Sequence, residues 1–483
     1  MSDTLMVGVS GVRGIVGKDI TPEVVARWAM AFGLWARERR PAVVVGRDAR
    51  PSGPEFAQAA IAALRRAGCD VIDVGLVPTP TVQLAVEHHH AGGGIAITAS
   101  HNPIEWNALK FIGPDGIFLD GDAGTRVRAL ADEGAGKGRG RGNPKELPRG
   151  RGEGGRVSAD AAAVERHLEG VLGLPGLGVA QIRARGLTVA LDAVRGAGGV
   201  IMPALLERLG CRVVGVNLET DGRFPRAPEP VPEHLGELAA LVRGSGADIG
   251  MAVDPDVDRL ALVDEAGAPI GEDYTLAFAV RAVLGGQAVS RLGAQPPLTA
   301  YPPNRLTVVC NLSTSLVVED AARDCGATVV RTPVGEVHVA RKIVELRAPI
   351  GGEGNGGVMY PALHVGRDAP VAAALVLALV ARTGRRVSEW VAAAPRYAIV
   401  KAKLERGTRN AERRLDDVYA ALRSRFPEAS ADTQDGLRLA WRDRWLHVRP
   451  SNTEPIIRLI AEAPSGAEAE QLVNEGRLSC AAS

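Results

Sequence analysis

The 483-residue sequence predicts an α/β protein made of three related α/β domains in tandem and a smaller C-terminal α+β domain. Three segments, which begin at Ala42, Leu187 and Leu306, share one pattern. In each, a β-branched run leads through a polar loop into an amphipathic helix, which ends near a glycine before a second β-branched run. This pattern is typical of a βαβ unit, and the three copies lie too far apart for a solenoid. They therefore indicate three domains of the same kind.

The composition is that of an ordinary globular protein. Hydrophobic residues make up 46% and charged residues 23%, and the formal net charge is +1. A charge this close to zero gives no electrostatic reason to expect nucleic-acid or membrane binding. The five cysteines are dispersed without metal-type spacing, as in proteins of a reducing compartment. The first residues do not resemble a signal peptide, and the apolar run at 369–380 is too short to cross a bilayer, so we expect a cytoplasmic protein.

Changes in sequence character predict the domain boundaries. The first domain spans residues 1–156 and ends in a Gly- and Arg-rich segment, 134–156, that cannot build a core. This segment lacks the aromatic residues that stack on bases, which favours a surface loop over an RNA-binding tract. Ser158 is expected to cap a helix that runs to about Leu172. The second domain spans 157–268, the third 269–386 and the α+β domain 387–483, with a charged helix at 409–426 and short strands near 436–441 and 445–449.

The stretch from Gly92 to Pro103 carries the first group of reactive side chains. Its apolar run ends in a polar turn that presents Ser100 beside His101, as strands do where they deliver a side chain to a cleft. Ser100 is either a nucleophile or a plain turn residue, since Ser, Asn and Pro also favour turns. Lys110 follows closely and can serve as an acid or a base if it is desolvated.

Two arginine-containing segments precede this stretch. Arg13 stands between Gly11 and Gly14 near the N-terminus, where it is a further candidate for the site. The segment Arg47-Asp48-Ala49-Arg50 is interpreted as a salt-bridge loop of the first domain.

Three aspartates alternate in a tight loop between two apolar runs. Asp254, Asp256 and Asp258 can converge on a hard cation such as Mg²⁺, which would offset three like charges on one loop. An EF-hand is excluded because Arg259 occupies the sixth position, where that loop needs glycine, and because the flanking runs are strand-like.

Two further loops carry polar groups suited to a sugar phosphate. The run Gly352–Gly357 matches a GxGxxG pattern, but Pro361 opposes the helix that a dinucleotide site needs. A loop that approaches a ligand closely, with Glu353 and Asn355 directed at hydroxyls, fits better. The second loop, Arg449–Arg458, offers hydroxyls, an amide and two guanidinium groups, which suits a phosphate, although a polar turn is the alternative.

Together these sites resemble the α-D-phosphohexomutases, the family of phosphoglucomutase, phosphomannomutase and phosphoglucosamine mutase. The match covers almost the whole chain, and it rests most firmly on the serine segment Thr98–Pro103 and the aspartate segment Asp254–Arg259. The resemblance implies four domains around a central cleft. It also implies interconversion of hexose 1- and 6-phosphates through a phosphoserine and a hexose 1,6-bisphosphate.

The resemblance further implies a role for each candidate residue. Ser100 would be phosphorylated, and with Asp254, Asp256 and Asp258 it would hold Mg²⁺. Arg13 and Arg259 would stabilise the transferring phosphoryl group, with His101 and Lys110 as acid/base candidates. The groups expected to contact the substrate comprise Gly335, Glu336, Glu353 and Asn355 for the sugar and Arg449, Ser451, Asn452, Thr453 and Arg458 for the second phosphate.

The sugar loop departs from the form found in many bacterial members. Asn355 and Gly357 stand where those members carry Ser and His, which is closer to the archaeal-type phosphoglucosamine mutase and phosphomannomutase branch. Glu336 replaces a basic residue or histidine and could favour an amino sugar, so glucosamine phosphate stands beside mannose and glucose phosphate as a substrate. The alternatives are a non-catalytic sugar-phosphate-binding protein and a phosphatase of the same fold. A monomer or a homodimer is expected, without nucleic-acid or membrane partners.

Overall fold

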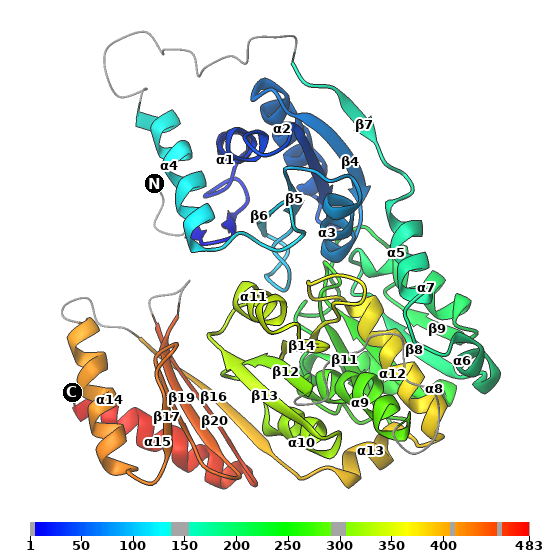
Figure 1. Cartoon of the computed structure of the whole chain (residues 1–483), viewed down its shortest axis with the longest axis vertical. Helices are drawn as coiled ribbons and strands as arrows, with labels where there is room; N and C mark the ends of the chain where they lie inside the picture. The colour runs from blue at the N-terminus through cyan, green and yellow to red at the C-terminus, as the bar shows by residue number, and fades with distance from the viewer. Residues whose placement is uncertain (1–4, 137–153, 291–305, 406–410, 452–455, 483) are drawn as a thin grey trace.

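The computed structural model describes residues 5–136, 154–290, 306–405, 411–451 and 456–482. Four β-sheets follow one another along the chain, and Figure 1 shows them arranged in an arc that runs from the first domain at the top to the fourth at the lower left. Three of these units combine parallel strands with helices and the fourth is an antiparallel sheet, which confirms the predicted fold class.

The first domain is built on a seven-stranded mixed sheet of order β1-β2-β6-β5-β3-β4-β7. β3 lies parallel to β4 and β5, whereas β6 pairs antiparallel with both β5 and β2. The elements are β1 (Met6–Gly8), β2 (Gly11–Ile15), α1 (Pro22–Arg37), β3 (Ala42–Arg47), α2 (Gly53–Arg66), β4 (Asp70–Leu76), α3 (Thr79–His88), β5 (Gly93–Ile97), β6 (Trp106–Ile112), α4 (Gly121–Gly136) and β7 (Val157–Ala159).

The second and third domains repeat one topology, with sheets of order β11-β10-β8-β9 and β13-β12-β14-β15. In each sheet three strands are parallel and the remaining edge strand closes an antiparallel hairpin. The elements of the second domain are α5 (Ala163–Leu172), α6 (Val179–Arg185), β8 (Thr188–Asp192), α7 (Gly198–Arg208), β9 (Arg212–Val216), the short 3₁₀ helix Pro232–His234, α8 (Gly236–Ser245), β10 (Ile249–Val253) and β11 (Leu260–Val263). Those of the third are α9 (Asp273–Ser290), β12 (Leu306–Asn311), α10 (Leu316–Asp324), β13 (Ala327–Thr332), α11 (Glu336–Leu346), β14 (Ile350–Glu353), β15 (Gly357–Met359) and α12 (Ala369–Thr383).

The three predicted βαβ repeats are confirmed. They correspond to β3-α2-β4, β8-α7-β9 and β12-α10-β13, each with its two strands paired in parallel. β-Branched residues fill the strands because both faces of the sheets are covered.

The fourth unit is an antiparallel sheet of order β16-β20-β19-β18-β17. Its predicted strands are present as β18 and β19, and the charged helix is present as α14. The elements from the end of the third unit are α13 (Val387–Ala393), β16 (Ala398–Glu405), α14 (Ala411–Arg425), β17 (Ser430–Asp432), β18 (Leu437–Ala440), β19 (Trp445–Pro450), β20 (Ile456–Ala463) and α15 (Gly466–Ala482).

The second and third domains share one hydrophobic core. A single cluster of buried apolar side chains runs from Leu168 to Val387, whereas the first and fourth domains have clusters of their own. Helix α12 accounts for the sharing, because residues 369–381 are all buried and it packs against α9 as well as α5, α6 and α7. A helix that is apolar on every side is stable only when it is enclosed in this way.

One local prediction was wrong, and another lies outside the described residues. Ser158 does not cap a helix, because it belongs to β7, which pairs in parallel with β4, and α5 begins at Ala163. Residues 137–153 of the Gly- and Arg-rich segment are outside the described part of the chain. Within the described part, no helix combines the length and the apolar character needed to cross a membrane.

Candidate functional site

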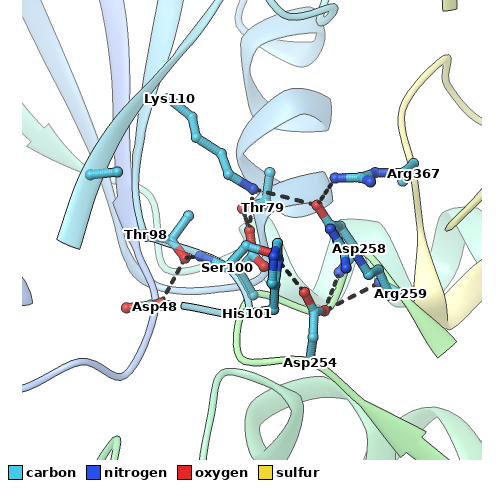
Figure 2. Close-up of polar contacts among 12 residues, drawn as sticks. Asp48, Thr79, Thr98, Ser100, His101, Lys110, Asp254, Asp258, Arg259 and Arg367 are labelled. Atoms are coloured by element: carbon cyan, nitrogen blue, oxygen red, sulfur yellow. Dashed lines mark hydrogen bonds and ion pairs between the residues drawn. The ribbon is translucent and has the colours of Figure 1, made fainter. Parts of the chain in front are cut away.

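The serine loop, residues 98–105, connects β5 to β6 and presents Ser100 to the second domain. Ser100 is buried, and its hydroxyl donates a hydrogen bond to Oδ2 of Asp254 at 2.9 Å (Figure 2). Its backbone φ is +48°, a left-handed conformation that is uncommon for a residue other than glycine. A buried non-glycine residue in this conformation must be held by its surroundings.

Two buried first-domain residues, Asp48 and Arg50, hold the loop. The Thr98 hydroxyl donates to Asp48 at 2.7 Å and accepts from the Ser100 amide at 2.9 Å. Arg50 is fully buried, pairs with Asp48 at 3.1 Å, and donates at 2.6–2.8 Å to the carbonyl oxygens of Ser100, Asn102, Pro103 and Trp106. The predicted salt bridge is therefore present, and it also fixes the backbone around Ser100.

The aspartate loop, residues 254–259, closes the hairpin of β10 and β11. Asp254 Oδ1 accepts hydrogen bonds from the amides of Asp258 and Arg259, which folds the loop around its own carboxylate. Val257 occupies the left-handed region with φ +62°, so the turn is tight. Thr79, at the start of α3, donates to Asp256 Oδ2 at 2.6 Å and ties the loop to the first domain.

The three carboxylates of this loop have the properties of a cation site. All three are buried, and oxygens from Asp254, Asp256 and Asp258 lie within 4.8 Å of one another. Burial, together with the neighbouring Asp258 and Asp256, raises the pKa of Asp254 well above its usual range. Asp256 Oδ1 is buried and has no hydrogen-bond partner among the described residues. The set of oxygens therefore fits a hard divalent ion.

Two basic side chains lie at the edge of this cluster. The Lys110 ammonium is 2.6 Å from Asp256 and 3.4 Å from Asp258; burial opposes its charge, but the two carboxylates outweigh this and raise its pKa. His101 Nδ1 lies 3.4 Å from the Ser100 hydroxyl. The Arg259 guanidinium, together with burial, holds the pKa of His101 well below its usual range.

The two predicted arginines also lie beside the serine and aspartate loops. Arg13 belongs to β2, opposite Ala108 of β6, and its guanidinium donates to the Asn102 side chain at 3.3 Å. It therefore sits on a strand of the first domain's sheet. Arg259 is buried, with Nε 3.6 Å from Asp258 and a hydrogen bond to Glu229 of 3.3 Å.

The sugar loop is the turn between β14 and β15, and it rests directly on the aspartate loop. The Leu260 amide donates to the Gly356 carbonyl at 3.0 Å. A Cβ at Gly356 would lie 2.4 Å from the Leu260 carbonyl oxygen, and φ there is +86°, so glycine is needed for both space and conformation. Glu353 accepts from Asn311 at 2.8 Å and from the Gly335 amide at 3.2 Å, while the Asn355 side chain accepts from the Gly357 amide. The turn leads into the antiparallel strand β15, and not into the helix that a dinucleotide-binding turn needs.

Sequence reasoning missed Arg367, which joins these loops. This buried arginine precedes α12 and pairs with Asp258 at 2.6 Å (Figure 2). It also pairs with Glu353 at 2.8 Å and with Glu336 at 3.0 Å. Its signal in the sequence was the charged pair Arg367-Asp368 placed directly before a wholly apolar run.

The predicted phosphate loop lies between β19 and β20 of the fourth domain. Arg449 is buried, faces Arg458 across the two strands, and donates to Asp435 at 2.8 Å. The same Asp435 carboxylate accepts from the Val334 amide beside Gly335, which connects this strand to the third domain. Ser451 directly follows the end of β19 at Pro450, and Asn452 and Thr453 lie outside the described residues.

Four family models match most of the chain. The models of phosphoglucomutase/phosphomannomutase alpha/beta/alpha domains I, II and III and of the C-terminal domain match residues 4–136, 165–267, 290–397 and 399–478.

Individual relatives agree with these models. A phosphoglucomutase/phosphomannomutase of Thermococcus kodakarensis is 37% identical, over 97% of each chain. A protein of Methanopyrus kandleri named probable phosphoglucosamine mutase is 35% identical, over 97% of this chain and 96% of its own. The crystal structure of a phosphoglucomutase/phosphomannomutase family protein from Burkholderia thailandensis superposes with a TM-score of 0.81 at 27% identity, and the match covers 99% of this chain and 96% of that one. The resemblance to this family, including its archaeal-type branch, is confirmed: the chain belongs to the phosphoglucomutase/phosphomannomutase family.

Proposed function

We propose that this protein is a phosphohexomutase that interconverts hexose 1-phosphates and hexose 6-phosphates. The observation that carries the proposal is the Ser100 hydroxyl, held 2.9 Å from Asp254 at the edge of three buried carboxylates. A hydroxyl in that position can carry a phosphoryl group beside a cation, which is what phosphoryl transfer requires.

Ser100, Asp254, Asp256 and Asp258 are proposed to hold Mg²⁺, which when bound neutralises charge on the phosphoryl group. In the first half-reaction, the bond between phosphorus and Ser100 Oγ breaks as a sugar hydroxyl oxygen bonds to phosphorus. The hydroxyl proton passes to one of the two acid/base candidates, His101 and Lys110. In the second half-reaction, Ser100 Oγ bonds to the phosphorus of the other phosphate of the hexose 1,6-bisphosphate as the bond from that phosphorus to its sugar oxygen breaks. The proton held by the acid/base residue passes to this sugar oxygen, so the enzyme ends as it began.

Other residues bind and orient the substrate in this proposal. Arg13 and Arg259 offset charge on the transferring group. Gly335, Glu336, Glu353 and Asn355 contact the sugar. The second phosphate is assigned to Arg449, Ser451, Asn452, Thr453 and Arg458. Because the Asp435 carboxylate contacts both Arg449 and the Val334 amide, the proposed phosphate and sugar contacts are physically linked.

The proposed substrates are the phosphates of glucosamine, mannose and glucose, and the names of the two archaeal relatives span the same three sugars. Four domains divided at residues 156, 268 and 386, a monomeric or homodimeric state, and a cytoplasmic location complete the proposal. Strand β7, just beyond the first of these boundaries, still pairs with β4 in the sheet of the first domain.

The test measures product and intermediate together. With a hexose 1-phosphate and Mg²⁺, the wild-type protein is expected to form the 6-phosphate, and mass spectrometry of the purified protein should find phosphate on Ser100. Ser100→Ala should lose both, whereas Ser245→Ala, a matched change on the outer helix α8, should lose neither. Chelation of divalent ions should stop turnover and Mg²⁺ should restore it.

Other results would contradict the proposal in distinct ways. Release of inorganic phosphate without 6-phosphate would indicate a phosphatase. Binding of sugar phosphate without turnover would indicate a binding protein. Full mutase activity in Ser100→Ala would refute the phosphoserine mechanism.

A further inference from the structure

Arg367 is a single cation shared by three loops of the site. Its three guanidinium nitrogens contact carboxylates from the aspartate loop, the sugar loop and the start of α11, which are Asp258, Glu353 and Glu336. The Arg367 side chain is 9% exposed, and each partner carboxylate is 8% exposed or less. Asp258 also has Lys110 and Arg259 nearby, but Arg367 is the only cation within ion-pair distance of Glu336 and Glu353 among the described residues, so these two buried carboxylates depend strongly on it.

The two glutamates of this group depend on Arg367 to different degrees. Both oxygens of Glu336 are engaged by Arg367, Oε2 by the guanidinium and Oε1 by the main-chain amide at 3.2 Å. Glu353 has additional donors in Asn311 and the Gly335 amide, but these are neutral. Removing the guanidinium would therefore leave two carboxylates beside the sugar loop without their shared arginine.

Gly357 makes room for this arginine. A Cβ at position 357 would lie 2.2 Å from Cδ of Arg367 and 2.9 Å from its Cγ. Gly357 is not among the residues with positive φ, so its backbone conformation does not require glycine. The missing side chain is needed for space: Arg367 reaches its three partners by crossing directly over this glycine.

From this geometry we propose that Arg367 is a specificity-determining residue that sets the charge of the sugar pocket. By engaging Glu336 and Glu353, its guanidinium prevents them from selecting a cationic sugar, so that neutral hexose phosphates are accepted. This inference rests on the proposed mutase function. It concerns sugars that differ in one substituent, a hydroxyl or an ammonium group.

The test compares glucosamine 6-phosphate with glucose 6-phosphate. Arg367→Gln should raise the ratio of kcat/KM for the amino sugar over the neutral sugar by about tenfold, as expected for one net charge several ångströms away in a partly buried pocket. Arg367→Lys keeps the positive charge but cannot contact all three carboxylates at once. Its ratio of kcat/KM for the two sugars should therefore stay near that of the wild type, while kcat falls for both sugars.

Gly357→Ala provides an independent perturbation, because it displaces the guanidinium without removing it. Its ratio should shift in the same direction as that of Arg367→Gln. Gly244→Ala on α8 is the matched control, since a methyl group there meets no atom within 4 Å. Equilibrium binding of the two sugar phosphates to the Ser100→Ala protein without added metal gives a readout that needs no turnover, and the same preference is expected there.

Each outcome supports or overturns the proposal. An unchanged ratio in both Arg367→Gln and Gly357→Ala overturns it, and so does an equal loss for both sugars, which would instead mark Arg367 as a phosphate contact. If Arg367→Gln does not fold, as judged by circular dichroism, Gly357→Ala decides the question alone. A wild-type protein without mutase activity would contradict the proposed function itself, while the binding comparison would still test the role of Arg367.

Discussion

Replacement of Arg50 by methionine is expected to release the serine loop. Methionine approximates the length of the arginine stem and fills the buried site, but it donates no hydrogen bonds. Four main-chain carbonyls around Ser100 would each lose the hydrogen bond from Arg50, and the buried Asp48 carboxylate would lose its ion pair. Ser100 could then leave the left-handed conformation in which Arg50 and Thr98 hold it.

The size of the effect follows from the burial of the pair. Both side chains are 0% exposed, and removing one partner of such a pair costs about 3–5 kcal/mol. Even the lower value corresponds to an increase of about a hundredfold in the population of the opened loop. The cost should fall on this loop in particular, because four of the contacts that Arg50 makes are to its backbone or to the first residue of β6.

Hydrogen–deuterium exchange measures this opening locally, which suits a protein of several domains better than one global unfolding free energy. Amides of the serine loop should exchange about a hundredfold faster in Arg50→Met, and phosphorylation of Ser100 should fall. Arg37→Met is the control, since Arg37 also donates to a main-chain carbonyl of the first domain, that of Ala67. The double variant Asp48→Asn/Arg50→Met should recover part of the loss, because it leaves no unpaired buried charge. Exchange within about threefold of the wild type, with normal phosphorylation, would refute the reasoning.

Two further predictions concern the site and its support. Gly356→Ala should lower kcat/KM for every sugar phosphate alike. Its methyl group would lie 2.4 Å from the Leu260 carbonyl oxygen and would separate the sugar loop from the aspartate loop. A selective effect on one sugar would contradict this prediction. Asp273 should make the protein less stable as pH rises, because desolvation raises its pKa to about 8 from an ordinary 3.8. Between these two pKa values the folded state keeps a proton that the unfolded chain loses. The contribution of Asp273 to the free energy of unfolding is therefore complete below about pH 4. It is lost as pH rises to about 8, by up to about 1.4 kcal/mol per pH unit. In Asp273→Asn the side chain can still accept the hydrogen bond from the Ser315 amide but no longer titrates. Urea unfolding at pH 5 and pH 9 should therefore show a smaller loss of stability with pH in this variant than in the wild type. An equal loss in both proteins would contradict the prediction.

The sequence predicts those parts of the structure that depend on residues close together in the chain. The βαβ repeats appear because β-branched runs and helix-ending glycines encode each unit within a few dozen residues. The aspartate loop could be recognised because its three carboxylates lie at alternate positions between two strands. Ser158 shows where this reasoning stops, because its preference for a helix cap was overridden by pairing of β7 with a strand far back in the chain.

The contacts that join the loops could not be predicted in the same way. Arg367 lies 109 positions from Asp258 in the chain, and no spacing rule relates the two. The sequence predicts the salt bridge of Arg50 with its neighbour, but the hydrogen bonds by which Arg50 holds the serine loop go to residues fifty or more positions away. Such contacts depend on how segments far apart in the chain pack against one another, within a domain for Arg50 and between two domains for Arg367, which a pattern in one segment does not encode.

The enclosed helix α12 determines how many separately packed parts the molecule has. Although its sequence follows the third unit, its burial among helices of the second makes the two units one cooperative block. The aspartate and sugar loops both belong to that block. The distance between the cation site and the sugar contacts is therefore fixed by packing in a shared core, because no hinge lies between the two loops. The serine loop and the phosphate strand are carried by separate cores on either side. Any movement of one domain against another would thus fall to these two outer parts, and it would leave the spacing between cation site and sugar contacts unchanged.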